Sequence, residues 1–130
     1  MNKTKVSFDF DSTLSIPDVE KYAEYLIKRG VEVWICTSRL SPENALNKEW
    51  NDDLFLIADK IGIKRENIIF TNYANKSEFL SNKGFKWHID DDNIELSFIK
   101  TDTDVIPIYL FGNSEWMSDC EKAFKQIKNK

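Results

Sequence analysis

The sequence is poor in cysteine and contains no long apolar run. Its two cysteines, Cys36 and Cys120, lack the spacing of a metal-ligand motif, so we expect two small buried thiols and no disulfide. No apolar run approaches the length that spans a bilayer, and the N-terminal stretch has no signal-peptide core. We therefore expect a soluble, cytoplasmic protein that has no membrane partner.

An excess of positive charge is also absent. The sequence sets 18 Lys and Arg residues against 22 Asp and Glu residues, which gives a formal net charge of −4 and a pI near 5.1. Such a chain exerts no long-range attraction on nucleic acid or on an anionic membrane. This balance disfavours a protein that binds nucleic acid in bulk, and it leaves a local basic patch open.

Internal repeats, low-complexity segments and linkers are missing as well, so we expect one domain over residues 1–130. The sequence instead alternates β-rich runs with stretches of helical spacing. The β-rich runs cover residues 4–8, 31–36, 67–70, 85–89 and 105–110. Strands that alternate with helices, without hairpin turns between them, predict an α/β fold. We expect a single doubly wound, mostly five-stranded parallel sheet with helices on both faces.

Individual residues mark where the expected helices begin and end. Gly30 and Gly62 follow the last apolar positions of the first two helices and are typical of helix C-termini. Asn75 predicts the cap of a helix that begins at the next residue. Ser114 predicts the cap of the last helix, which we expect to reach Ile127.

The first β-rich run leads into two aspartates one residue apart, followed by Ser12 and Thr13. Asp9 and Asp11 would point to the same side if the strand ran through both of them. We expect the strand to end near Asp9, so that both acids lie at its carboxyl end. Ligands of open α/β sheets bind at that edge, which makes this segment the centre of the predicted site.

Polar side chains also follow the later β-rich runs. Thr37, Ser38 and Arg39 end the second run, Lys76 begins the helix after the third run, and three aspartates at 90–92 follow the fourth run. A phosphoryl group in transfer needs neutralised oxygens, an attacking atom in line and a proton for the leaving oxygen. The sequence places a candidate for each need after a successive strand, which predicts phosphoryl-transfer chemistry.

With these motifs the chain resembles the haloacid dehalogenase (HAD) superfamily of phosphotransferases, whose first motif is an apolar strand followed by D-x-D-x-T. The resemblance implies a HAD-like Rossmannoid fold, with Asp9 as the nucleophile and Asp11 as the general acid and base. It also implies that the Thr37 hydroxyl binds a phosphoryl oxygen. Lys76 would offset the negative charge between the nucleophile and the phosphoryl group.

Several of these positions have alternatives. Ser38 is the alternative phosphate-binding hydroxyl, and Lys83 and Lys86 are the alternative lysines. Arg39 is a further candidate contact for the substrate phosphate, although an exposed arginine is more often simply solvated. His88 is the only histidine and lies within the fourth β-rich run, so we expect a structural side chain.

The three acids after the fourth run complete the predicted site. Adjacent carboxylates repel one another unless cations or hydrogen bonds offset their charge, and Mg²⁺ prefers oxygen ligands. The resemblance assigns Mg²⁺ as the cofactor, bound first by Asp91 and second by Asp90, beside Asp9 and Asp11. Asp92 is expected to cap the next helix instead.

The resemblance implies an enzyme without a cap domain, because residues 11–17 and 71–76 leave no length for an insertion. The expected function is magnesium-dependent hydrolysis of a phosphomonoester through an aspartyl-phosphate, with a nucleotide or another small phosphorylated metabolite as substrate. A polynucleotide-end or protein phosphatase of the same superfamily is an alternative, and residues 40–51 or a second subunit could serve as a lid. The alternative from another class is a phosphoacceptor or regulatory binding module that does not turn over.

Overall fold

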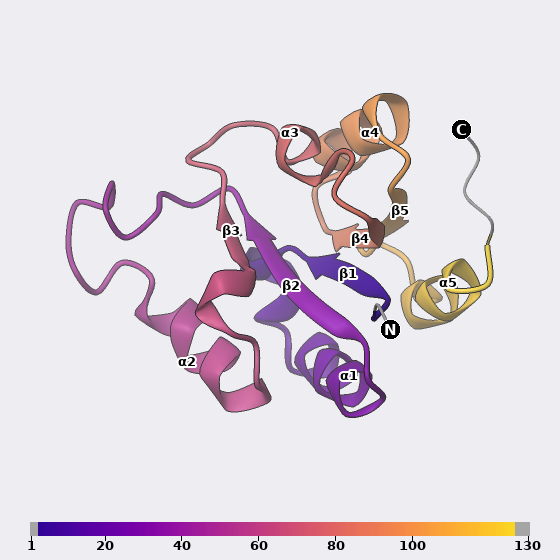
Figure 1. The fold of residues 1–130 in the computed structure, drawn as a ribbon, viewed down its shortest axis with the longest axis horizontal. Helices are drawn as coiled ribbons and strands as arrows, with labels where there is room; N and C mark the ends of the chain where they lie inside the picture. The colour runs from indigo at the N-terminus through magenta and orange to yellow at the C-terminus, as the bar shows by residue number, and fades with distance from the viewer. Residues whose placement is uncertain (1–2, 127–130) are drawn as a thin grey trace.

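The computed structural model describes residues 3–126, which form an α/β fold around one parallel sheet (Figure 1). All the neighbouring strands pair in parallel, in the order β3-β2-β1-β4-β5. The strands are β1 (Lys5–Phe8), β2 (Glu32–Thr37), β3 (Ile68–Phe70), β4 (Phe85–Asp90) and β5 (Ile106–Tyr109). The predicted fold class is therefore confirmed, with β1 at the centre of the sheet.

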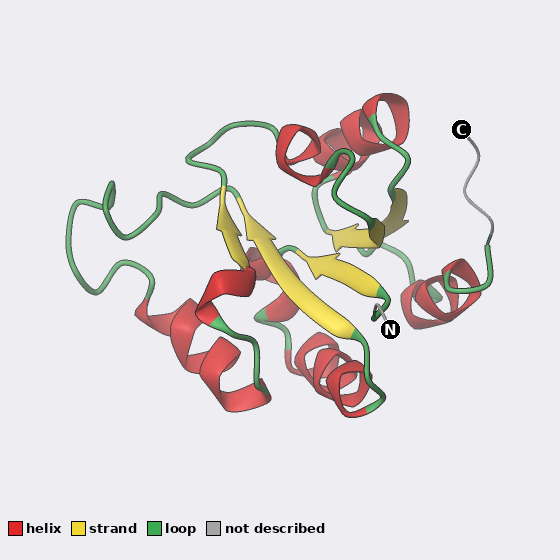
Figure 2. Cartoon of the chain, viewed as in Figure 1, coloured by secondary structure: helices red, strands yellow, loops and turns green. Residues whose placement is uncertain are grey.

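Helices cover both faces of the sheet (Figures 1 and 2). The helices are α1 (Pro17–Lys28), α2 (Asp52–Ile61), α3 (Lys76–Leu80), α4 (Asn93–Asp102) and α5 (Trp116–Ala123). Buried residues of α1, α2 and α5 share one core with the sheet, and those of α3 and α4 share the other. The chain is thus wound on both sides of the sheet, as the alternation of strands and helices predicted.

Apolar side chains that alternate along the strands build the two cores. On the α1, α2 and α5 face, the buried rings of Phe8 and Trp87 meet edge to face with their centroids 5.4 Å apart. The opposite core consists of Cys36, Leu80, Phe85, Leu96, Ile99 and Val105. Both cysteines are buried free thiols, as predicted.

The helix boundaries agree with the predictions only in part. Gly30 and Gly62 follow α1 and α2 with φ of +91° and +96°, a left-handed conformation that suits glycine. Helix α3 begins at Lys76 with Asn75 at the N-cap position, as predicted, but the Asn75 side chain makes no capping hydrogen bond, and the Glu95 carboxylate accepts from the Lys76 N–H. The predicted cap at Ser114 is wrong, since α5 begins after Glu115 without a side-chain cap.

Two other segments bear on the predictions. Ile127, which we expected within the last helix, lies outside the described residues. Residues 40–51, which the sequence left open as a loop or a short irregular helix, form turns without a helix or strand (Figure 2).

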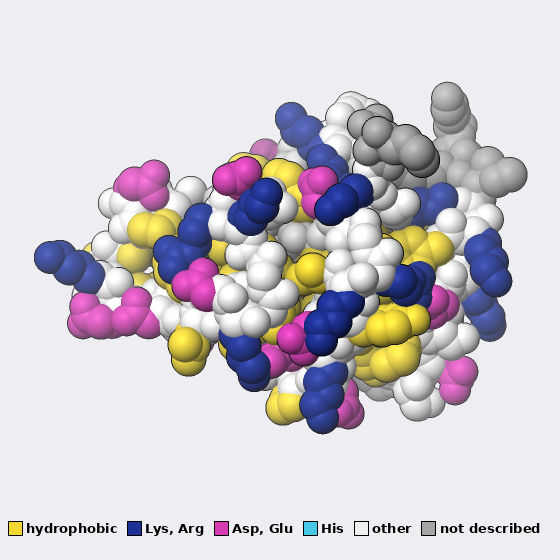
Figure 3. Space-filling view, turned by 60° about the horizontal axis from the view of Figure 1, so that its bottom comes forward, with side chains coloured by type: hydrophobic (Ala, Val, Ile, Leu, Met, Phe, Trp, Pro, Cys, Tyr) yellow, Lys and Arg dark blue, Asp and Glu magenta, His cyan; other side chains and the backbone are white. Residues whose placement is uncertain are grey.

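The surface carries charges of both signs. On the face that Figure 3 shows, Lys and Arg side chains are interspersed with Asp and Glu side chains and do not gather into one basic patch. In the described part of the chain, each helix is too short or too polar to cross a bilayer.

Leu54 and Leu56 provide a matched test of the core on α2. Leu54 is fully buried in the larger core, whereas Leu56 is 72% exposed two residues later. We expect Leu54→Ala to lower the free energy of unfolding by about 2–5 kcal/mol, because it removes buried methyl groups and leaves a cavity. Leu56→Ala should change the free energy by less than about 0.5 kcal/mol. Urea denaturation of both variants measures the difference, and equal losses would contradict the packing.

Candidate active site

The candidate site begins at the carboxyl end of β1, where Asp9 follows Phe8. The Asp9 N–H donates to the Ile89 carbonyl across the sheet at 3.0 Å, and the Asp9 carbonyl accepts from the Leu14 N–H at 3.1 Å. The intervening turn (Phe10–Leu14) is anchored by buried Phe10 and Leu14. These bonds fix the Asp9 backbone between the central strand and the turn that leads to α1.

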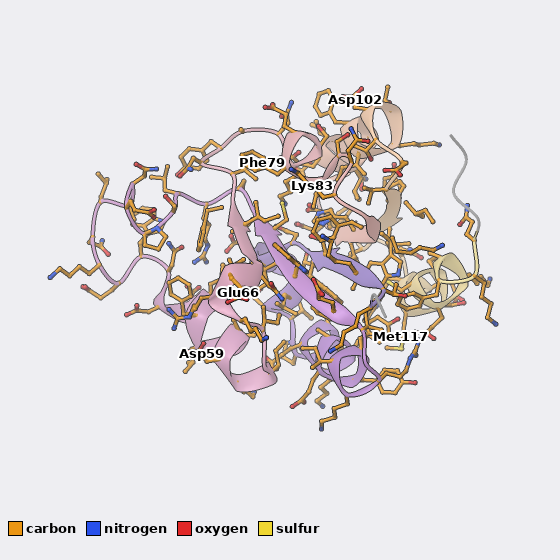
Figure 4. All side chains as sticks on the ribbon, in the orientation of Figure 1. Asp59, Glu66, Phe79, Lys83, Asp102 and Met117 are labelled. Atoms are coloured by element: carbon orange, nitrogen blue, oxygen red, sulfur yellow. The ribbon has the colours of Figure 1, made fainter. Side chains whose placement is uncertain are left out.

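Lys76 connects the end of β1 to the end of the neighbouring strand β4. Its Nζ donates to Asp9 Oδ1 at 2.8 Å and to Asp90 Oδ2 at 2.6 Å. The three side chains are only 3%, 7% and 0% exposed for Lys76, Asp9 and Asp90. The structure therefore brings together three predicted site residues that lie far apart in the sequence, whereas Lys83 lies exposed in the turn before β4 (Figure 4).

The polar chain continues into the sheet through His88. His88 Nε2 lies 2.8 Å from Asp90 Oδ2, and His88 Nδ1 lies 2.9 Å from Ser7 Oγ. A register shift between β1 and β4 aligns Ser7 with His88 and makes the second contact available. Burial lowers the pKa of His88, so the neutral imidazole donates from Nε2 to Asp90 and accepts from the Ser7 hydroxyl. His88 is a buried strand residue, as expected, but its link to Asp90 was missed.

The two carboxylates that contact the Lys76 ammonium differ in their pKa shifts. Burial acts to raise the pKa of Asp90, but the hydrogen bonds from His88 and Lys76 outweigh it and hold that pKa below its ordinary range. Burial raises the pKa of Asp9 well above its usual value, and the ammonium of Lys76 only partly offsets this. Burial acts to lower the pKa of Lys76, yet Asp9 and Asp90 together hold it above its ordinary value. Burial therefore dominates at Asp9, whereas its partners His88 and Lys76 dominate at Asp90.

Asp9 is also one of three carboxylates that lie close together. Asp9, Asp90 and Asp91 each offer an oxygen, and these oxygens all lie within 4.8 Å of one another. The Thr13 hydroxyl lies 3.1 Å from Asp9 Oδ2 and 3.5 Å from Asp91 Oδ1. An all-oxygen donor set beside a buried carboxyl group with a raised pKa fits a hard divalent cation such as Mg²⁺. Thr13 belongs to the D-x-D-x-T pattern, but its contacts with Asp9 and Asp91 were not predicted from the sequence.

Asp92, the third acid after the fourth β-rich run, caps helix α4. Asp92 Oδ1 accepts from the N–H groups of Ile94 and Glu95 at the start of α4, and so caps that helix as predicted. The Asp92 N–H in turn donates to Asp90 Oδ1 at 3.0 Å. Asp92 thus holds the Asp90 carboxylate in place through its backbone.

The side chain of Asp11 does not join the three carboxylates. Its oxygens accept from Arg39 at 2.8 and 3.0 Å, and Arg39 also pairs with Asp53 at 2.8 Å. The strand ends before Asp11, so the alternation that would place it beside Asp9 does not continue. The structure therefore places Asp11 outside the carboxylate group to which the metal prediction assigned it.

Arg39 is held on several sides. Its guanidinium lies over the Phe10 ring at 5.0 Å, and its side chain is only 15% exposed, so it is not simply solvated. The hydrogen bonds that Arg39 donates to Asp53 and Asp11 raise the pKa of Arg39, and the bond from Arg39 lowers the pKa of Asp53. Asp53 had no signal in the sequence, because an aspartate in the first helical turn is common without any partner.

Lys76 and the three carboxylates line a cavity of about 540 Å³ at the carboxyl edge of the sheet. Of the two hydroxyls at the carboxyl end of β2, Ser38 lines the cavity, whereas Thr37 is fully buried and its Oγ1 accepts from the Arg39 N–H at 3.3 Å. The lining residues are Asp9, Asp11, Ser12, Ser38, Lys76, Asp90, Asp91, Asp92, Asn93, Ile94 and Glu95. The cavity therefore combines acids, one ammonium and small hydroxyls.

The chain matches no protein-family model, no curated protein and no solved structure. The arrangement of side chains in this cavity is therefore the basis on which a function can be proposed.

Lys76 can be tested through stability. We expect Lys76→Met to lower the free energy of unfolding by about 3–5 kcal/mol in the presence of a chelator, because it leaves buried carboxylates without their cation. Lys83→Met is the matched control and should change it by less than about 0.5 kcal/mol, since Lys83 is exposed (Figure 4). Urea denaturation provides the comparison. Equal free energies of unfolding for the two variants would show that the contacts of Lys76 with Asp9 and Asp90 do not stabilise the fold.

Proposed function

We propose that the chain is a cytoplasmic, magnesium-dependent phosphomonoester hydrolase of the HAD type, working through an aspartyl-phosphate on Asp9. The observation that carries the proposal is the Lys76 ammonium, which bridges Asp9 and Asp90 inside a cavity at the carboxyl edge of the sheet. The two free buried thiols are compatible with a reducing compartment.

Asp9 provides the nucleophile in this proposal. Its side chain is held by the Lys76 ammonium at one oxygen and the Thr13 hydroxyl at the other, which orients it toward the cavity that it lines. A carboxylate oxygen attacks phosphorus, the bond from phosphorus to the leaving oxygen breaks, and an aspartyl-phosphate forms. Lys76 and the Ser38 hydroxyl, which also lines the cavity, are the groups that offset negative charge on the phosphoryl oxygens.

Asp11 provides the proton transfers. It gives a proton to the leaving oxygen in the first step and then takes a proton from the water that attacks phosphorus. That attack breaks the bond from phosphorus to the Asp9 oxygen, which frees the Asp9 carboxylate and releases inorganic phosphate. The Asp11 carboxylate is held in an ion pair with Arg39, so that pair must loosen before Asp11 can reach the leaving oxygen. Arg39 retains Asp53 as a partner when it releases Asp11, which keeps its guanidinium in place.

The residues that would hold Mg²⁺ are Asp9, Asp90 and Asp91, with Asp11 no longer contributing its side chain. The cation would neutralise charge on the phosphoryl group and on Asp9 when bound. Asp90 has its orientation fixed by His88, Lys76 and the Asp92 N–H, so its carboxylate is organised before any ligand arrives.

A non-turnover phosphoacceptor module is the competing function, and one observation favours it. Asp11 is engaged in an ion pair with Arg39, whereas a hydrolase needs it as a mobile proton carrier. Phosphate release from a generic aryl phosphate separates the two functions. Stoichiometric phosphorylation of Asp9 without sustained release would favour the module.

The adjacent acids Asp91 and Asp92 should separate metal binding from helix capping. We expect Asp91→Ala to weaken Mg²⁺ binding by at least about tenfold with little loss of stability, because it removes a carboxylate ligand. Asp92→Ala should cost about 1 kcal/mol of stability through the lost cap and leave Mg²⁺ binding largely intact. Calorimetric Mg²⁺ titration and urea denaturation measure the two effects. Equal losses of affinity would mean that the ligands are wrongly assigned.

The roles of Asp9 and Asp11 can be distinguished by the leaving group. Asp9→Asn should abolish turnover and prevent trapping of phosphate on the protein, because an amide is a poor nucleophile. Asp11→Asn should slow hydrolysis of an alkyl phosphate by about 10²–10⁴-fold. The loss should be smaller for an aryl phosphate with an acidic phenol, whose leaving oxygen needs no proton. An identical fold-loss on both substrates would count against Asp11 as the proton donor.

A further inference from the structure

A second cavity, of about 710 Å³, adjoins the carboxylate cavity. Ser12 and Asp91 line both cavities, so the two share a boundary next to the three carboxylates. The second cavity lies between the start of α1, the loop after β5 and the start of α5. A molecule with its phosphate near Asp9 would therefore have room to extend past Ser12 and Asp91.

The lining of this second cavity differs in chemistry from that of the first. Ile16, Leu110, Phe111 and Trp116 give it apolar and aromatic walls, and Phe111 is 74% exposed. Trp116 packs edge to face against Tyr22 at 5.5 Å, which fixes its ring at the start of α5. An exposed ring beside a fixed one provides apolar surface that a ligand can cover.

The charged residues of the lining all have one sign. They are Asp18 and Asp91, and Lys, Arg and His are absent from the lining of this cavity in the described part of the chain. An anionic group in this cavity would find no Lys, Arg or His side chain among the described residues of the lining to pair with, and Asp18 would repel it. The lining thus accepts an uncharged ring and disfavours a second phosphate or a carboxylate.

We propose that this second cavity binds the alcohol part of the phosphomonoester substrate, and that this part carries an apolar or aromatic ring and no second anionic group. The inference rests on the proposed function, because the phosphate of the same molecule must occupy the carboxylate cavity. The volume lies within the range of small-molecule pockets. Simple aryl phosphates and nucleoside monophosphates have this chemistry, whereas bisphosphates and the phosphodiester chain of a polynucleotide end do not.

Three non-hydrolysable phosphonates test the cavity without relying on turnover. The probes are ethylphosphonate, 2-phenylethylphosphonate and 2-(4-carboxyphenyl)ethylphosphonate, each titrated calorimetrically into the protein with Mg²⁺ present. Because burial of the ring removes apolar surface from water, the phenyl compound should bind at least about tenfold more tightly than the ethyl compound. The added carboxylate should reverse most of that gain, because it would meet Asp18 and no cationic side chain of the lining as the structure describes it.

Matched variants test whether the phenyl ring of the probe binds in the second cavity. Trp116→Ala should weaken the phenyl compound by about tenfold and leave the ethyl compound unchanged. Phe111→Ser is a second variant whose side chain is 74% exposed in a loop, so it tests the cavity without risk to the fold. Phe98→Ser, on α4 outside this cavity, is the control and should change neither affinity. Equal binding of the phenyl and ethyl compounds, or equal effects of Phe111→Ser and Phe98→Ser, would overturn the proposal.

Hydrolysis of ethyl phosphate and 2-phenylethyl phosphate then separates the two proposals, because the two alcohols have similar leaving groups. Phosphonate binding in the expected order without phosphate release would overturn the hydrolase and leave the ring-binding cavity standing. Phosphate release from both esters without that order of binding would overturn the cavity and leave the hydrolase standing. Failure of both measurements would overturn both proposals.

Discussion

The buried contact of Lys76 with Asp9 and Asp90 connects the fold with the candidate site. Each of these charges would be costly in the interior alone, and the two carboxylates would also repel each other without the ammonium between them. The contact joins the start of α3 to the ends of β1 and β4. The same three side chains therefore constrain the sheet and hold the Asp9 carboxyl group at the cavity.

The order of the strands explains why residues so far apart in sequence meet. β1 lies at the centre, with β2 and β4 on either side, so the ends of these three strands form one edge. Asp9 follows β1, Ser38 follows β2, and Asp90 ends β4. In open parallel sheets the connections leave a crevice at this point, and the carboxylate cavity lies there. The second cavity lies at the same edge, beside the loop that follows β5.

The sequence predicted the fold well because the signals for it are local. β-rich runs alternate with helical patterns, and glycines with positive φ end two of the helices. The site was predictable where its residues follow strand ends, as with Asp9, Lys76 and Asp90, because topology alone brings such residues to one edge.

Contacts that depend on packing between elements were not predictable. The pairing of Asp11 with Arg39, the choice of Ser38 over Thr37 in the cavity and the contact of His88 with Asp90 each depend on orientations that no local pattern encodes. The contact at the start of α3 is of the same kind. Glu95 of α4, close to α3 only in three dimensions, accepts from the Lys76 N–H, whereas the Asn75 side chain makes no capping hydrogen bond.

The charge balance of the carboxylate cavity explains why the proposed Mg²⁺ and the phosphate of the proposed substrate would bind together. Its lining has six acids, Asp9, Asp11, Asp90, Asp91, Asp92 and Glu95, with Lys76 as the cation among the lining residues. Arg39 neutralises part of the charge of Asp11 from beside the cavity, and helix α4 takes up Asp92. Because an excess of negative charge remains, a phosphate dianion alone would be repelled from Asp9. A divalent cation would remove that repulsion and lower the raised pKa of Asp9, so the group that prepares the nucleophile would also admit the substrate.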